Sequence, residues 1–161
     1  MDVSNQLAHV EKWHYVGPVS SLPDIHQDED TRAQVRAGCK TLCIPRPNQS
    51  GGSRNTRSNL DEQVLVFRYR GLIHAIDNKC PHSSFPLREG SILDIEDAGP
   101  NIRCFRHGWT FDLTTGQADR GNHKITLWHI ELRDPLISGS DENGVSVEKE
   151  VWVRRRPNGI R

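Results

Sequence analysis

Four residues whose side chains bind transition metals occur in two short groups. Cys80 and His82 form a C-x-H motif, and Cys104 and His107 form a C-x2-H motif. Thiolate sulfur and imidazole nitrogen are the ligands that zinc sites and iron–sulfur centres take from proteins. The sequence therefore predicts one four-ligand metal site, to which two separate loops each contribute two side chains.

The distribution of the ligands distinguishes two kinds of metal site. A structural zinc site usually takes two cysteines from one loop and two histidines from another, whereas here each loop supplies one of each. Such mixed loops suit a binuclear iron–sulfur centre in which two histidines replace two cysteines on one of the two irons. This Rieske-type [2Fe-2S] arrangement is our first interpretation, and a mononuclear zinc site is the alternative.

The sequences of both loops resemble the cluster-binding loops of the Rieske [2Fe-2S] protein family. The first loop reads C-P-H at residues 80–82, and the second reads C-x-x-H-G-W-x-F-D at residues 104–112. The similarity to soluble Rieske-type ferredoxins extends from about Lys12 to Val153, and it is loose outside the two loops.

The resemblance implies one Rieske-type [2Fe-2S] cluster per chain and a division of labour among four ligands. Cys80 and Cys104 would hold an inner iron. His82 and His107 would hold an outer iron near the surface, where electrons enter and leave. Cofactor binding and metal binding therefore fall on the same four residues, and the sequence predicts no catalytic residue.

Several positions depart from the pattern of the high-potential members of the family. Cytochrome bc-type Rieske proteins carry an extra disulfide-forming cysteine in each loop, where this chain has Phe85 and Arg106. They also carry a Ser and a Tyr after the second loop, where this chain has Trp109 and Phe111. Phe105 replaces a frequent proline, and the segment after the second loop lacks a clear proline that would cover the cluster. We expect no disulfide and a low reduction potential.

Composition limits the classes of partner. The chain has 161 residues, with 21 basic and 21 acidic side chains and no net charge. This length suits one domain, and the balance of charge gives no reason to expect a nucleic acid or a membrane surface as partner. No apolar run approaches the roughly 20 residues that span a bilayer, and the first residues do not resemble a signal peptide. We therefore expect a cytoplasmic protein with reduced thiols.

Short strands with turn signals between them predict an all-β protein. The clearest signal is a hairpin, in which residues 64–70 and 72–77 flank Gly71 and lead directly to Cys80. Further strands are expected within five segments, at 9–19, 39–45, 102–113, 125–132 and 144–153. We expect a single domain over residues 1–161, with antiparallel β-sheets as a base and a small cluster-binding subdomain at about 78–118.

Other segments lead to four smaller expectations. Residues 46–62 are almost without apolar side chains and predict a mobile insertion. Residues 87–100 predict a polar connection that passes around the cluster between the two loops. Cys39 and Cys43 lie too far apart on one strand for a disulfide and are expected to be buried. His74 alternates with apolar neighbours on a strand and is expected to be a structural or exposed residue rather than a ligand.

The predicted chemistry leads to an electron carrier rather than a catalyst. Four protein ligands and bridging sulfides leave no open position for a substrate, and too few residues follow Gly116 for the mononuclear iron domain of a Rieske oxygenase. We expect a ferredoxin that accepts electrons from a flavin-dependent reductase and passes them to an oxygenase or another terminal oxidoreductase. Two alternatives stay open: a small subunit or module of a larger oxygenase or nitrite-reductase-like complex, and a zinc-binding interaction module.

Overall fold

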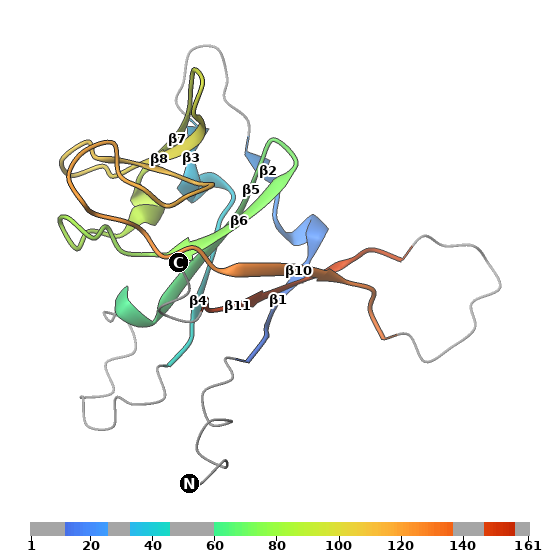
Figure 1. The fold of residues 1–161 in the computed structure, drawn as a ribbon. Helices are drawn as coiled ribbons and strands as arrows, with labels where there is room; N and C mark the ends of the chain where they lie inside the picture. Colours follow the sequence, from blue (N-terminus) through green and yellow to red (C-terminus); the bar gives the residue numbers. More distant parts are fainter. Residues whose placement is uncertain (1–11, 26–32, 46–59, 137–146, 157–161) are drawn as a thin grey trace, which may run out of the picture.

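The computed structural model describes residues 12–25, 33–45, 60–136 and 147–156. In this part of the chain the regular elements are strands and short 3-10 helices, and no α-helix occurs among them. The strands form three sheets (Figure 1). The prediction of an all-β fold is confirmed, although one short strand pair is parallel rather than antiparallel.

The base sheet joins the two ends of the described chain. Its strands are β1 (His14–Pro18), β10 (His129–Arg133) and β11 (Glu150–Arg154), with β11 in the middle and antiparallel to both neighbours. Val151 and Val153 of β11 alternate into the interior and are fully buried. The last two predicted strands are therefore present, but the regular pairing begins later than expected, at residues 129 and 150.

The central sheet contains the predicted hairpin. Its four strands are β2 (Asp24–Ile25), β4 (Lys40–Cys43), β5 (Gln63–Tyr69) and β6 (Leu72–Asp77). β5 pairs with β4 and β6 in antiparallel fashion and with β2 in parallel. Arg70 and Gly71 both have positive φ, at 49° and 81°, which is the backbone that a two-residue hairpin turn requires. β6 then ends three residues before Cys80.

Both faces of β5 are buried, so the strand separates two hydrophobic cores. Val64 and Val66 point into the core shared with the base sheet. Leu65, Phe67 and Tyr69 point into the other core, which contains the thiols of both metal-binding motifs. This alternation explains why β5 is an almost continuous apolar run instead of an alternating one.

The third sheet lies at the top of Figure 1 and carries the second loop. Its four strands are β3 (Ala33–Gln34), β7 (Ser91–Ile95), β8 (Gly99–Arg103) and β9 (Thr110–Asp112). The polar connection expected over residues 87–100 contains regular structure that was not predicted, since β7 and β8 form a hairpin there. Ile92 and Ile102 face each other within it and are buried. Asp97 and Gly99, with φ of 70° and 82°, form its turn.

Four 3-10 helices complete the described elements, namely η3 (Val19–Ser21), η4 (Val35–Ala37), η5 (Leu60–Glu62) and η6 (Leu87–Glu89). Residues 46–59 of the predicted insertion lie outside the described residues, and its last three residues form η5. All four cysteines are free, as expected. Cys39 is half-buried, but Cys43 is exposed, so the expectation that both are buried was wrong for Cys43.

Candidate metal centre

The fold brings the two predicted loops together from two different sheets. The first loop follows β6 of the central sheet, and the second connects β8 to β9 of the third sheet. The hydroxyl of Ser83 in the first loop lies 3.5 Å from Sγ of Cys104 in the second. The imidazole rings of His82 and His107 have centroids 5.1 Å apart and meet edge to face at 74°. All four predicted ligands therefore lie in one region.

Two backbone hydrogen bonds close the first loop. The N–H of Cys80 donates to the carbonyl of Phe85 at 2.9 Å, and the N–H of Ser84 donates to the carbonyl of Cys80 at 2.8 Å. Ser84 has a φ of 57°. The cysteine is thus at the start of a compact turn, and His82 lies at its tip.

The second loop repeats this arrangement. The N–H of Cys104 donates to the carbonyl of Trp109 at 2.8 Å, and the N–H of Gly108 donates to the carbonyl of Cys104 at 3.1 Å. Gly108 has a φ of 73°, at the position that Ser84 occupies in the first loop. A side chain at Gly108 would also crowd the guanidinium of Arg103, because an added Cβ would lie 3.0 Å from its Nη2. Glycine therefore suits this position on two grounds.

Burial divides the four predicted ligands into an inner and an outer pair. Cys80 is 0% exposed and Cys104 is 1% exposed, whereas His82 and His107 are both classed as exposed. Two buried thiols below two exposed imidazoles are the donor set that a mixed-ligand [2Fe-2S] cluster needs. The arrangement fits the expected inner and outer irons, while the assignment of these residues as ligands stays a prediction.

Aromatic rings surround His82. Its imidazole stacks on Trp109, with ring centroids 4.1 Å apart and planes 13° apart. His123 meets both rings edge to face, at 5.9 Å from His82 and 5.2 Å from Trp109. These contacts come from the second loop and from residue 123, and they restrict the plane of the His82 ring.

Residues 119–123 supply further contacts to Trp109 and His82 that were not predicted from the sequence. The carboxylate of Asp119 accepts a hydrogen bond from the N–H of Thr110 at 3.3 Å and pairs with Arg120 at 3.1 Å. The guanidinium of Arg120 lies 5.5 Å from the centre of the Trp109 ring. As the sequence shows, this segment has no proline, and its residues pack on the second loop. Its only signal in the sequence is a glycine at 121, which lets the chain pass close to Trp109.

Electrostatics at the exposed end disfavour protonation of His82. Its pKa is lowered first by partial desolvation and then by the neighbouring His107, His123 and Arg120. Asp119 has a pKa below the usual range of aspartate, chiefly because Arg120 donates a hydrogen bond to it. A histidine that stays neutral keeps its lone pair available for a metal.

A buried asparagine holds the ends of the first loop together. Asn78 precedes the loop, and its side chain is 0% exposed. Its Nδ2 donates to Oε1 of Gln63 at 2.9 Å, and its Oδ1 accepts from the N–H of Arg88 at 2.9 Å. Because Arg88 follows the loop, this one side chain connects the residues on both sides of Cys80 and His82 to β5.

Ser83 places a hydroxyl group near one of the two buried thiols. Trp109 and Phe111 provide no hydroxyl after the second loop, as expected. The first loop nevertheless places the Ser83 hydroxyl 3.5 Å from Sγ of Cys104, within the range of a hydrogen bond to sulfur. No pattern in the sequence indicates this contact, because it joins two separate loops.

The described residues contain neither a compact site for a single metal ion nor a helix that could cross a membrane. In residues 12–25, 33–45, 60–136 and 147–156, no three His, Cys, Asp or Glu side chains gather closely enough to hold a single metal ion. Within the same ranges, no helix has the length and apolar character needed to cross a membrane.

Comparison with known proteins identifies the family. The family model described as Rieske [2Fe-2S] domain matches residues 40–128. A human Rieske domain-containing protein is 36% identical over 78 residues, which are 48% of this chain and 49% of that protein. The ferredoxin subunit of 3-phenylpropionate/cinnamic acid dioxygenase from Photorhabdus laumondii is 29% identical over 77 residues, covering 48% of this chain and 68% of the subunit. The aligned region thus spans only about half of the human relative.

The fold is also shared with solved structures. The ferredoxin of carbazole 1,9a-dioxygenase from Nocardioides aromaticivorans IC177 superposes with a TM-score of 0.52 at 16% identity, over 90% of this chain and 99% of that ferredoxin. At this level of identity the likeness concerns the fold alone. The family match favours the iron–sulfur interpretation over mononuclear zinc. This chain belongs to the Rieske [2Fe-2S] domain family, whose cofactor is a [2Fe-2S] cluster and whose activity is electron transfer.

Proposed function

We propose that this chain is a ferredoxin that takes single electrons from a flavin-dependent reductase and passes them to a terminal oxygenase or related oxidoreductase. The main support for this proposal is the pair of loops, each closed by two equivalent backbone hydrogen bonds. Together the loops present two buried thiols and two exposed imidazoles. We assign the buried Cys80 and Cys104 and the exposed His82 and His107 as the ligands. When bound, the [2Fe-2S] cluster supplies a one-electron couple.

The cysteines and the histidines have different roles: the cysteines are shielded from water, and the histidines are open to contact with a partner. The two cysteines lie within a hydrophobic core with Phe111 and Leu87, so water is excluded from their sulfur atoms. The two imidazoles lie at the surface, where a partner can approach them closely. Since all four ligand positions come from the protein, no site is left for a substrate, and the chain would act as a carrier.

The proposal extends to the organisation and setting of the chain. We propose one Rieske domain over residues 1–161, in which residues 78–118 form the cluster-binding subdomain. Similarity to a dioxygenase ferredoxin subunit supports an oxygenase as acceptor, and the donor is proposed from chemistry alone. The cytoplasm, where thiols remain reduced, is the proposed compartment.

Electron paramagnetic resonance provides the direct test. Anaerobically purified protein should contain two irons and two sulfides per chain and, after reduction by dithionite, should give the rhombic signal of mixed histidine and cysteine ligation. His107→Cys should shift this signal toward all-thiolate ligation or remove the iron. His129→Gln is the matched control, because His129 lies in the base sheet and should leave the signal intact. Colourless protein with one zinc per chain would refute the proposal.

The alternative of a small subunit predicts a different assembly. A ferredoxin should dissociate from its partners during gel filtration, whereas a subunit should remain with a larger chain. Stable co-purification with a catalytic subunit from the native source, at equal stoichiometry, would favour the subunit and contradict the free carrier.

A further inference from the structure

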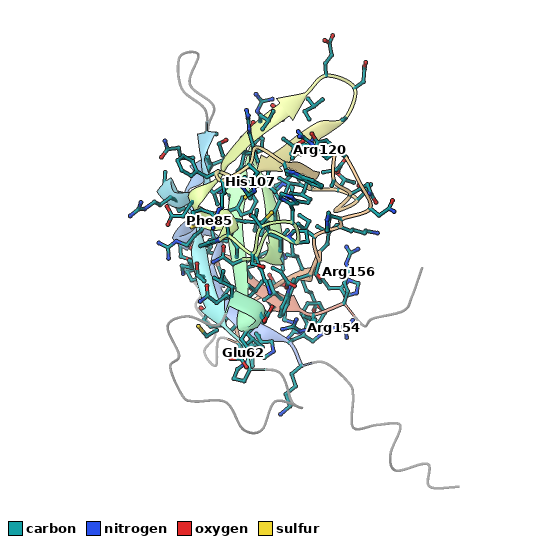
Figure 2. All side chains as sticks on the ribbon, turned by 90° about the vertical axis from the view of Figure 1, so that its left-hand side faces the viewer. Glu62, Phe85, His107, Arg120, Arg154 and Arg156 are labelled. Carbon is teal, nitrogen blue, oxygen red and sulfur yellow. The ribbon has the colours of Figure 1, made fainter. Side chains whose placement is uncertain are left out.

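A hollow of about 850 Å³ opens beside the second loop. Six of the residues that line it matter here: Arg36, Phe85, Arg103, Phe105, Arg106 and His107. Phe85 and His107 lie near each other in Figure 2, which looks onto this side of the molecule. The hollow therefore reaches one of the two exposed imidazoles, and anything bound in it lies next to the proposed electron exit.

The hollow is lined by three arginines and by one acidic side chain, Glu89. Arg36 pairs with Glu89 at 3.3 Å. Arg103 and Arg106 form no ion pair within the described part of the chain. Two guanidinium groups without a carboxylate partner are thus available, and guanidinium binds carboxylates in a geometry of two parallel hydrogen bonds.

An aromatic pair lies among these charges. Phe105 follows Cys104 directly and is 76% exposed. Its ring lies 6.4 Å from the half-buried Phe85, with planes 28° apart. A large apolar ring exposed beside unpaired arginines is typical of an interface, where aromatic and arginine residues supply most of the binding energy.

We propose that this hollow is the docking site for an acidic segment of the chain's electron-transfer partner. Carboxylates of the partner pair with Arg103 and Arg106, and an apolar side chain beside them covers Phe105. Bound in this way, the partner lies against His107. This inference rests on the proposed function, because it names the surface through which that function is exerted.

The surface around Arg120 does not line the hollow and is a poorer site for the same partner. There Arg120 is already neutralised by Asp119 and lies over Trp109. Charge complementarity therefore favours the side of the hollow, and Arg120 provides a matched comparison that carries the same charge beside the same loops.

Binding of a pentaglutamate peptide tests the site directly. In calorimetric titration at low salt, Arg103→Gln together with Arg106→Gln should weaken binding about tenfold, whereas Arg120→Gln should change it little. Glu89→Gln should strengthen binding, because it frees Arg36. Pentalysine should not bind. Equal losses in the double variant and in Arg120→Gln, or no loss in either, would overturn the inference.

Electron transfer to small oxidants gives an independent readout. Stopped-flow oxidation of the dithionite-reduced protein by ferricyanide, an anion, should slow about tenfold in the double variant at low salt. Oxidation by the cation hexaammineruthenium(III) should not slow. Arg106→Gln alone, on the exposed loop, should give a smaller effect of the same sign and covers the case in which a change at Arg103 impairs folding.

The two proposals fail in different ways. If the reduced wild-type protein lacks the rhombic signal, the proposed function is wrong. If the signal and the midpoint potential are normal in every variant but neither pentaglutamate affinity nor the ferricyanide rate changes, the electron carrier stands and the docking site is wrong.

Discussion

Ser83 is expected to raise the reduction potential of the centre. Its hydroxyl is 3.5 Å from Sγ of Cys104, so it can donate a hydrogen bond to that sulfur. Reduction adds negative charge, which strengthens a hydrogen bond donated to a cysteine ligand and stabilises the reduced state. Ser83→Ala removes the donor and should lower the midpoint potential.

The size of the shift follows from the energy of one such bond. A single hydrogen bond contributes a net of about 1 kcal/mol. For a one-electron couple, a free-energy change of about 1.4 kcal/mol shifts the midpoint potential by roughly 59 mV. If most of the bond is gained on reduction, the midpoint should fall by about 40 mV. The contact is long, which places the expected value toward the lower part of the range of about 20–60 mV.

Potentiometric titration followed by electron paramagnetic resonance measures this shift. Thr114→Val is the control, because it removes a hydroxyl from an exposed turn beyond β9 and should leave the potential unchanged. An unchanged or higher potential in Ser83→Ala, with the signal intact, would refute the reasoning. The wild-type midpoint itself should lie toward the low end of the roughly −150 to +300 mV span of Rieske centres.

Three further predictions concern the scaffold, each measured by urea denaturation followed by circular dichroism. Asn78→Ala should cost about 3 kcal/mol, since it removes two buried hydrogen bonds and strands the N–H of Arg88; a loss no larger than for an exposed asparagine would contradict this. The pKa of His74 is lowered by burial, so the unfolded chain takes up more protons, and stability should fall as pH drops below about 6.5. His74→Leu should reduce this pH dependence and increase stability, because it removes a buried Nε2 with no partner in the described chain; an unchanged slope between pH 5.5 and 7.5 would count against it. Gly90→Ala should cost about 2–3 kcal/mol, because its Cβ would lie 2.2 Å from the carbonyl oxygen of Arg103; wild-type stability would disprove the clash.

Local chemistry was predictable from the sequence. The spacing of cysteine and histidine indicated two mixed loops, and both loops lie where that spacing required. The hairpin around Gly71 was predicted because its turn residues and flanking apolar runs are neighbours in the chain. In each case the information lies within a few residues, where backbone preference and side-chain type act together.

Contacts between distant segments were not predictable in the same way. His123 has no motif around it, yet the fold brings it against His82 and Trp109. The β7–β8 hairpin was missed because its polar turn outweighed two short apolar stretches, which are stabilised by packing of Ile92 against the rest of the core. These features depend on how distant segments pack against the two cores on either side of β5.

The matching hydrogen bonds in the two loops bear on how the protein acquires its metal. Each loop is closed by hydrogen bonds within its own backbone. The two buried cysteines and two exposed histidines proposed as ligands lie in one region of the folded chain. We therefore expect that the folded chain can take up a cluster after synthesis without an unfolding step.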